Sequence, residues 1–139
     1  MTTQQSALKP PIAIAHADTA PFWRGTAHGE LLYQRCRACE RTQFPPRQHC
    51  AHCQAGELEW LRSAGRGTVH TFTVVHRAPT AAFKDDVPYA IALVDLDEGF
   101  RMMMNVLGCP PAELEIGSRI RVVFRPHGEA ILPQAEIDR

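Results

Sequence analysis

The sequence has no long apolar run, no excess of either charge and very little lysine. It nowhere contains the 18 or more consecutive apolar residues that a membrane-spanning helix needs. The 15 Lys and Arg residues balance 15 Asp and Glu residues, which excludes a supercharged nucleic-acid-binding tail. Apolar residues make up 45% of the chain and charged residues 22%, which excludes wholly disordered and collagen-like chains. The 139 residues therefore predict one ordinary domain, or two very small ones that share a core.

The N-terminus also lacks the features of an export signal. Residues 1–17 have neither a basic n-region nor a sustained apolar h-region, and we expect them to form a flexible polar arm. The cysteine count is five, whereas a secreted disulfide scaffold favours an even number. These observations predict a cytoplasmic protein without a membrane partner, whose reduced thiols hold a metal.

The basic residues are almost all arginine and are unevenly distributed. Only Lys9 and Lys84 are lysines. Residues 24–66 contain seven Arg and four Glu, a net charge of +3, whereas residues 67–139 carry a net charge of −3. A guanidinium can bind a phosphate in a bidentate fork, but a solvated surface position is the simpler interpretation for any single arginine here.

The sequence predicts a short helix and isolated strands before residue 63, and a series of regular strands after residue 67. A capping side chain and a proline in Asp18–Pro21 predict a helix start, and residues 18–34 are expected to hold a short helix and a lead-in strand. Residues 58–61 are a candidate returning strand, and the break at 63–67 marks a module boundary. The remaining chain predicts strands at 68–76, 89–96, 100–106, 119–125 and 130–133, with a loop at 78–87 and a helical turn at 110–114.

Five short strands with a helical turn between the third and fourth predict a small closed barrel over residues 65–136. Closure removes the exposed edges of so small a sheet. The five-stranded OB-fold is the natural candidate and an SH3-like barrel is the alternative. Alternation within the strands predicts three groupings: Val69, Thr71, Thr73 and Val75 on one face of the first strand; Ile120, Val122 and Phe124 on one face of the fourth; and Met103 opposite Met102 and Met104 in the third.

Two paired cysteine motifs carry the strongest chemical signal. Cys36-x-x-Cys39 and Cys50-x-x-Cys53 each aim two thiolates at one point, and together they supply a tetrahedral four-sulfur site. Zinc matches the softness of these ligands and is common in closed structural sites, although a rubredoxin-like iron centre uses the same ligands. Residues 35–64 are therefore predicted to form a zinc ribbon, held together by metal because the module is too small for its own core.

The residue that follows each Cys-x-x-Cys motif is not glycine. Knuckles of this kind often have glycine there, where φ is positive, but this chain has Glu40 and Gln54. A non-glycine residue in that conformation costs about 1 kcal/mol. Zinc binding contributes on the order of 10–16 kcal/mol in small sites, so the fold can absorb this strain. His49 and His52 lie near the motifs, but four thiolates need no histidine.

Several motifs together resemble a known family. They are Phe22-Trp23, Leu31-Leu32-x-Gln34-Arg35-Cys36-x-x-Cys39, Phe44-Pro45-Pro46-Arg47-x-x-Cys50-x-x-Cys53, Gly65-x-Gly67-Thr68-Val69, Thr71–Arg77, Val87-Pro88-Tyr89 and Ile116-Gly117. In this combination the sequence is similar to the acyl-CoA-associated zinc-ribbon/OB-fold protein family, first catalogued as a domain of unknown function. The resemblance implies a mainly β chain with an N-terminal helix, a rubredoxin-like zinc ribbon and a C-terminal five-stranded OB-fold barrel.

The resemblance also implies a function. Members of that family are accessory partners of thiolase-like enzymes, or of MaoC-type hydratases and aldolases, in lipid, steroid or acyl-CoA metabolism. They help to form or shield the acyl-CoA site of a hetero-oligomer and are generally not catalytic alone. We therefore expect a thiolase-fold enzyme or an acyl-CoA hydratase/aldolase subunit as the partner, with acyl-CoA as a ligand.

Candidate contact residues follow from this expectation. The acyl-CoA candidates are Phe44, Pro46, Arg47, His76 and Arg77, because a rigid apolar wall and arginine forks suit the acyl chain and the phosphates. A structural turn in the ribbon is the alternative role for the Phe-Pro-Pro-Arg stretch. Phe22 and Trp23 are candidate anchors for the partner, since aromatic residues are enriched at hot spots, and packing within the chain is the alternative.

Two other classes of function remain. Zinc ribbons and OB-folds also occur in single-stranded nucleic-acid-binding modules, but zero net charge and few barrel aromatics argue against nucleic acid as a partner. An independent enzyme would need a nucleophile such as Cys109 beside one of His70, His76 and His127. A lone cysteine is more often a small packed residue, and no catalytic residue is predicted.

Overall fold

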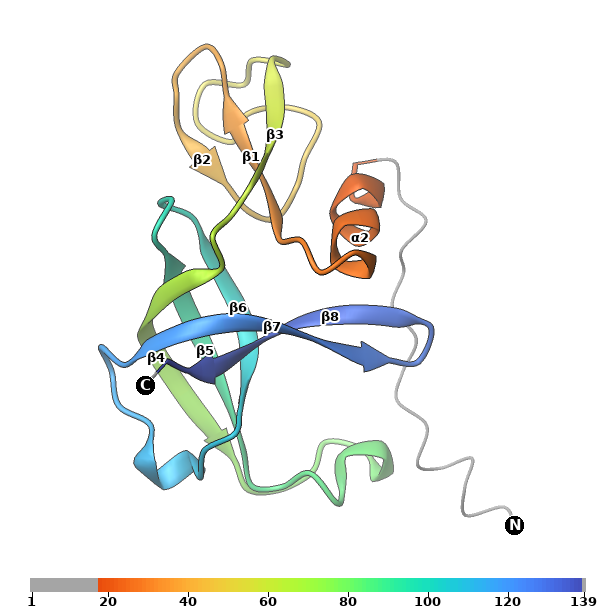
Figure 1. Cartoon of the computed structure of the whole chain (residues 1–139), viewed down its shortest axis with the longest axis vertical. Coiled ribbons are helices and arrows are strands. Elements are labelled where there is room, and N and C mark those ends of the chain that lie inside the picture. The colour runs from red at the N-terminus through yellow and green to blue at the C-terminus, as the bar shows by residue number, and fades with distance from the viewer. Residues whose placement is uncertain (1–17, 139) are drawn as a thin grey trace.

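The computed structural model describes residues 18–138 and is mainly β, with one α-helix (Figure 1). The arm predicted for residues 1–17 lies outside the described residues. Figure 1 shows a small sheet above a barrel, with the helix packed beside both. The elements are α2 (Ala20–Ala27), β1 (Leu32–Cys36), β2 (Thr42–Gln43), β3 (Leu58–Arg62), β4 (Arg66–Val75), η1 (Ala81–Phe83), β5 (Tyr89–Leu96), β6 (Arg101–Leu107), η2 (Pro111–Glu113), β7 (Arg119–His127) and β8 (Ala130–Ile137). Among the described residues, no helix is long and apolar enough to cross a membrane.

The short helix α2 lies where the sequence places it. Proline in its first turn fits the helical φ and needs no hydrogen-bond partner for its nitrogen. The chain leaves the helix through Gly29, whose φ of 72° suits glycine. Gly25 lets α2 approach β1, since a Cβ there would lie 2.9 Å from the Leu32 side chain. Phe22 is buried in the core, so the face of the helix that carries it packs against the rest of the protein.

The upper sheet has the strand order β2-β1-β3, with antiparallel pairs throughout. Its longest pairing joins β1 to β3 from Leu32–Arg62 to Cys36–Leu58. The very short strand β2 is not predicted from the sequence, because two residues carry no measurable periodicity.

The five remaining strands close into a barrel of order β4-β5-β6-β8-β7, completed by pairing of β4 with β7. All pairs are antiparallel except β6 with β8. The turn η2 sits between the third and fourth barrel strands. This arrangement confirms the predicted five-stranded OB-fold class and is not that of the SH3-like alternative.

A β-bulge corrects one prediction about side-chain direction. The register of β4 against β5 shifts between Val69 and Thr71, so one extra residue stands on β4. The shift reverses the alternation. Val69 is buried, whereas Thr71 and Thr73 are exposed, and Phe72 instead packs against the core. The prediction that Val69 shares a face with Thr71 and Thr73 is therefore wrong.

The other predicted patterns are confirmed. Met102 and Met104 are each 4% exposed, whereas Met103 between them is 69% exposed. On β7, Ile120 is fully buried, and Val122 and Phe124 pack against the core. The last strand, β8, runs four residues further than predicted, because Pro133 pairs with Phe124 without ending the ladder.

Several contacts join the upper sheet to the barrel. Tyr33 of β1 stacks on Phe100 with ring centroids 4.6 Å apart. Glu98, in the β5–β6 turn, accepts hydrogen bonds from the Ser63 hydroxyl and from the Ala64 backbone N–H, both at 2.7 Å. Just after this linker, within the barrel, Gly67 of β4 has no room for a side chain, because a Cβ there would lie 2.6 Å from the Asp95 carbonyl oxygen of β5. The linker between sheet and barrel is therefore fixed by specific bonds.

Candidate metal centre and apolar cleft

The four paired cysteines meet at one end of the upper sheet. Their Sγ atoms all lie within 4.8 Å of one another. Cys36 Sγ lies 3.6 Å from Cys53 Sγ, and Cys39 Sγ lies 3.6 Å from Cys50 Sγ. A tetrahedral zinc ion with Zn–S bonds of about 2.3 Å places its sulfur ligands roughly 3.8 Å apart. The predicted cysteines are thus brought together at a spacing that fits one such ion.

Backbone amides surround these sulfur atoms. The Cys36 Sγ faces the N–H of Cys39 at 3.5 Å, and the Cys50 Sγ faces the N–H groups of His52 and Cys53 at 3.3 and 3.5 Å. The Cys53 and His52 amides lower the pKa of the Cys50 thiol to about 6 against the opposing effect of burial. The Ala55 amide lowers the pKa of Cys53, but burial and the neighbouring thiols raise it to about 12. A cation is the natural partner for four thiolates in such a small space.

The two turns that shape the site have positive φ where the sequence predicts it. Glu40 has a φ of 67° and Gln54 a φ of 66°. Their amides donate to the carbonyls of Cys36 and Cys50 at 2.8 and 2.9 Å, which closes each turn. The conformation is therefore adopted without glycine.

Two buried glutamines, which the sequence does not single out for this role, connect the ribbon loops. The Gln34 carboxamide donates to the Arg47 carbonyl and accepts from the Arg47 N–H, both at 2.8 Å. Its oxygen also accepts from Gln43 Nε2 at 2.8 Å, and the Gln43 oxygen accepts from the Ala51 N–H at 2.7 Å. The sequence signals for this network are that Gln34 lies two residues before the first cysteine and that alternation along β1 places both on one face.

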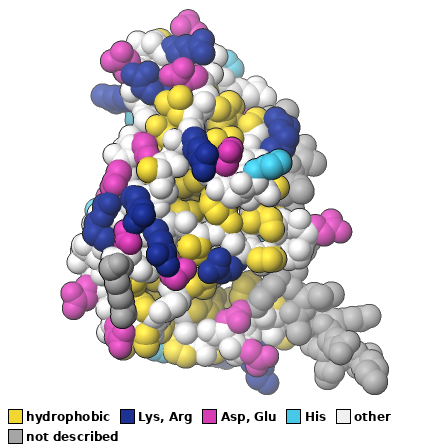
Figure 2. All heavy atoms as spheres, in the orientation of Figure 1, with side chains coloured by type: hydrophobic (Ala, Val, Ile, Leu, Met, Phe, Trp, Pro, Cys, Tyr) yellow, Lys and Arg dark blue, Asp and Glu magenta, His cyan; other side chains and the backbone are white. Residues whose placement is uncertain are grey.

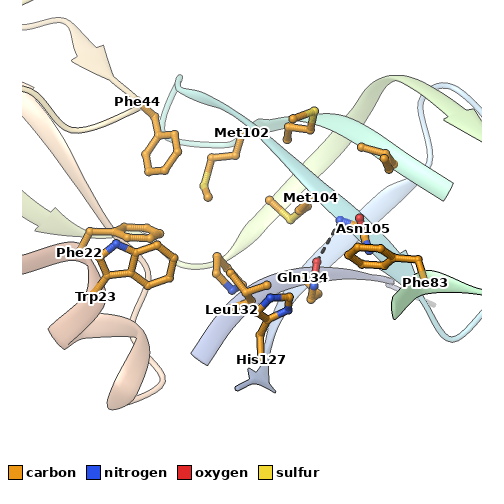
Figure 3. A pocket seen from close by; sticks show the side chains of 13 residues that line it. Phe22, Trp23, Phe44, Phe83, Met102, Met104, Asn105, His127, Leu132 and Gln134 are labelled. Carbon is orange, nitrogen blue, oxygen red and sulfur yellow. Dashed lines mark hydrogen bonds between the residues drawn. The ribbon is translucent and has the colours of Figure 1, made fainter. Parts of the chain in front are cut away.

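A second feature is an apolar cleft of about 440 Å³ between α2, the ribbon and the barrel. Phe22 and Trp23 come from α2, and Phe44 comes from the ribbon loop. Figure 3 shows these three rings facing Met102 and Met104 of β6 across the cleft. Phe22 is in ring contact with Trp23 and Phe44, at centroid distances of 4.9 and 5.3 Å. Figure 2 shows apolar side chains gathered in the middle of one face, with charged side chains around them.

The cleft exists because two barrel strands diverge. β6 and β8 pair only at Val106–Ala135 and Leu107–Glu136. Beyond that point Gln134 bridges the strands, because its Oε1 accepts a hydrogen bond from the Asn105 backbone N–H at 2.9 Å. A second cavity of about 520 Å³ adjoins the first at Phe83, Asn105, His127 and Gln134, which line both.

The structure brings only some of the predicted contact residues to this cleft. Phe44, Phe22 and Trp23 line it. Phe22 is 4% exposed and so packs within the chain, whereas Trp23 is half-buried. Pro46 is buried in the ribbon, and Arg47 is exposed with its backbone held by Gln34.

Of the remaining candidates, His127 lines this cleft and the others lie elsewhere. His76 and Arg77 are exposed just after β4 and line neither of the two cavities. Cys109 lines the second cavity, as does His127. The sequence analysis missed most of the cleft lining, because strand alternation gives no signal of a cavity. The missed residues are Phe83, Ile91, Met102, Met103, Met104, Asn105, Leu132, Pro133 and Gln134.

Family models match most of the chain. Residues 23–59 match the model described as "ChsH2, rubredoxin-like zinc ribbon domain", and residues 60–125 match "ChsH2, C-terminal OB-fold domain". A DUF35 domain-containing scaffold protein of Methanothermobacter thermautotrophicus is 36% identical over 110 residues, which are 78% of this chain and 82% of that protein.

Two further relatives have names that refer to enzymes. The 3-oxo-4,17-pregnadiene-20-carboxyl-CoA hydratase alpha subunit of Mycobacterium tuberculosis is 39% identical over 77% of this chain and 33% of its own length. The benzoylsuccinyl-CoA thiolase subunit BbsA of Thauera aromatica is 29% identical over 73% of this chain and 69% of its own length. This chain thus spans about a third of the length of the hydratase alpha subunits that it matches.

Among solved structures, a chain titled "Ltp2-ChsH2(DUF35) aldolase" superposes with a TM-score of 0.79. It is 32% identical in sequence, and the match covers 93% of this chain and 98% of that one. The similarity therefore includes both the ribbon and the barrel.

Proposed function

The chain belongs to the DUF35 family of zinc-ribbon and OB-fold scaffold proteins, and from that premise we propose that it is a non-catalytic accessory subunit of an acyl-CoA-processing enzyme. The observation that carries the proposal is the match of nearly the whole chain to one named as part of an aldolase complex. Relatives named as hydratase and thiolase subunits support a partner of the thiolase-like or hydratase/aldolase kind.

Zinc is the metal we assign to the ribbon. The donor set of four closely spaced sulfur atoms fits a structural Zn²⁺ site, and a bound ion would join the two knuckles into one unit. Cys36, Cys39, Cys50 and Cys53 would all be ligands, so no coordination position would remain for chemistry. The role of the ion is to hold the ribbon loops that carry Phe44 to the cleft.

The zinc assignment has a direct test. Cys36→Ser removes one ligand and should lose bound zinc together with the folded ribbon, because the small sheet has little core of its own. Metal content and a thermal melt would show both losses. Cys109→Ser is the matched control and should keep one zinc per chain. A Cys36→Ser protein that keeps zinc and the wild-type melting temperature would contradict the assignment.

The apolar cleft is the surface that we assign to the acyl group. Its aromatic and methionine side chains suit an apolar chain, and methionine adapts to differently shaped ligands. Two relatives are named for CoA thioesters whose acyl groups carry rings, a pregnadiene in one and a benzoyl group in the other. We therefore propose a ring-bearing acyl group as the ligand class for the cleft.

Partner binding should depend on the exposed part of the cleft rim. Trp23 is half-buried on α2, so truncating it should weaken association without unfolding the barrel. The test is purification of the tagged wild-type, Trp23→Ala and Trp60→Ala proteins from the native host, with a thermal melt of each. A thiolase-fold or hydratase subunit should accompany the wild-type and Trp60→Ala proteins but be depleted from Trp23→Ala. Equal recovery with all three proteins would remove Trp23 from the interface.

The charge pattern of the barrel favours a protein partner over nucleic acid. The arginines along β7 are engaged by carboxylates: Arg119 with Asp97 at 2.8 Å, and Arg121 and Arg125 with Glu136 at 3.2 and 3.5 Å. A phosphate backbone would have to displace these acids.

A further inference from the structure

We infer that the cleft recognises a neutral oxygen, a ketone or hydroxyl, on the ring-bearing acyl group, and that Gln134 donates the hydrogen bond to it. The inference rests on the proposed function for the presence of an acyl ligand and extends it to the ligand's chemistry. It concerns the end of the cleft where polar side chains replace apolar ones.

The first step is the one-sided placement of polar groups. Most of the 440 Å³ cleft is walled by aromatic, methionine, leucine and proline side chains. Asn105, His127 and Gln134 are its polar lining residues, and with Phe83 they border the second cavity; Figure 3 shows Asn105 and Gln134 beside Phe83, away from Phe44, and His127 next to Leu132. A ligand that fills the cleft is therefore apolar over most of its surface and meets hydrogen-bonding groups at one end.

The second step is the fixed orientation of one carboxamide. Gln134 Oε1 accepts the Asn105 backbone N–H at 2.9 Å, and only the oxygen of a carboxamide can accept that proton. The nitrogen, Nε2, is consequently the donor half of a side chain that lines the cleft. A donor held in place by the backbone of the neighbouring strand suits an acceptor oxygen on the ligand and does not suit an ammonium group.

The third step is the charge beyond this end of the cleft. Asp85 and Asp86 line the second cavity, which shares Gln134 with the first. Arg125 lines it as well, but it forms an ion pair with Glu136, whose Oε2 lies 3.5 Å from the Arg125 Nη2 atom. The carboxylate of Glu136 therefore offsets the positive charge of Arg125. A carboxylate at the junction would face these acids, so the oxygen bound there is uncharged. The CoA phosphates are then excluded from this end of the cleft.

The test uses three probes with related ring systems and the full, zinc-loaded chain. They are 1-tetralone, a neutral ketone; tetralin, its parent hydrocarbon; and tetralin-1-carboxylate, an anion. Titrations followed by ¹H–¹⁵N spectra would report affinity and would also show the Gln134 side-chain NH₂ signals directly. We expect 1-tetralone to bind about tenfold more tightly than tetralin, as one buried hydrogen bond allows, and the carboxylate to bind most weakly.

A matched set of variants separates recognition from packing. Gln134→Glu keeps an acceptor for the Asn105 N–H but replaces the donor with a second oxygen, so 1-tetralone should lose about tenfold in affinity while tetralin changes little. Gln48→Glu makes the same chemical change at an exposed ribbon position and should alter neither. Leu132→Ala removes part of the apolar wall and should weaken both probes.

Several outcomes would overturn the inference. They are equal affinity for ketone and hydrocarbon, tightest binding of the carboxylate, an equal loss for both probes in Gln134→Glu, or no saturable binding. These experiments need no partner enzyme. If an acyl-CoA enzyme is captured but no probe binds, the inference is contradicted and the proposed function is supported. If the probes bind as expected but no such enzyme is captured, the inference is supported and the proposed function is contradicted.

Discussion

Removing the Gln34 side chain tests whether the buried glutamine network, as well as the metal, holds the ribbon together. Gln34 is 3% exposed and makes three hydrogen bonds of 2.8 Å. Gln34→Leu would strip partners from the Arg47 N–H, the Arg47 carbonyl and one Gln43 N–H. Each group left unsatisfied costs about 1–3 kcal/mol when buried. Water can reach the exposed Arg47, so we expect a total loss near 3 kcal/mol in the free energy of unfolding.

The assay is thermal and denaturant unfolding of zinc-loaded protein, with zinc release to a competing chelator measured alongside. A loss of that size should lower the melting temperature by about 10 °C and speed zinc release. Gln48→Leu is the matched control, because Gln48 is an exposed glutamine in the same loop. If Gln34→Leu were as stable as Gln48→Leu, the network would not stabilise the ribbon and the reasoning would fail.

Three further predictions concern the backbone strain at the knuckle turns, the linker between sheet and barrel, and the pH dependence of one ion pair. Replacing both Glu40 and Gln54 with glycine should raise the free energy of unfolding by about 1 kcal/mol in total. Relief of the positive-φ strain at two positions is worth about 2 kcal/mol, and the greater chain entropy of unfolded glycine offsets about half of it; an unchanged melting temperature and unchanged zinc release to a chelator would contradict this. Glu98→Ala should cost about 2 kcal/mol, because it removes both bonds to the linker, whereas truncating an exposed glutamate should be neutral. Arg101 lowers the pKa of Asp95, so this pair stabilises the fold above the ordinary carboxylate pKa and ceases to do so as pH falls through the lowered value. Asp95→Asn should therefore cost under about 1 kcal/mol at neutral pH and nothing in strong acid, and an equal cost at both pH values would refute the assignment.

The elements that were predictable from sequence are those with a strong local signal. The spacing of the paired cysteines is enough to predict the metal site. The alternation of the third barrel strand correctly predicts that Met103 is exposed and that Met102 and Met104 are buried. Glu40 and Gln54 take the positive φ that their position after a knuckle requires. In each case the signal is carried by a motif of a few neighbouring residues, and the two cysteine motifs are separated by only ten residues.

What was not predictable depends on pairing between distant segments. The bulge after Val69 exists only in relation to β5, so alternation along β4 alone places Thr71 on the wrong face. The cleft forms where β6 and β8 diverge, and Gln134 acquires its role only because Asn105 lies opposite. The network around Gln34 likewise joins residues 13 positions apart.

Native mass spectrometry of the tagged protein purified from its natural host tests the accessory-subunit proposal most directly. The proposal predicts a complex with a thiolase-fold or hydratase/aldolase subunit in a fixed ratio, with one zinc ion for each copy of this chain. Acyl-CoA turnover by that complex should fall when this chain is removed and return when zinc-loaded chain is added back. A chain that emerges alone or with nucleic acid, or turnover that is unaffected by its removal, would contradict the account.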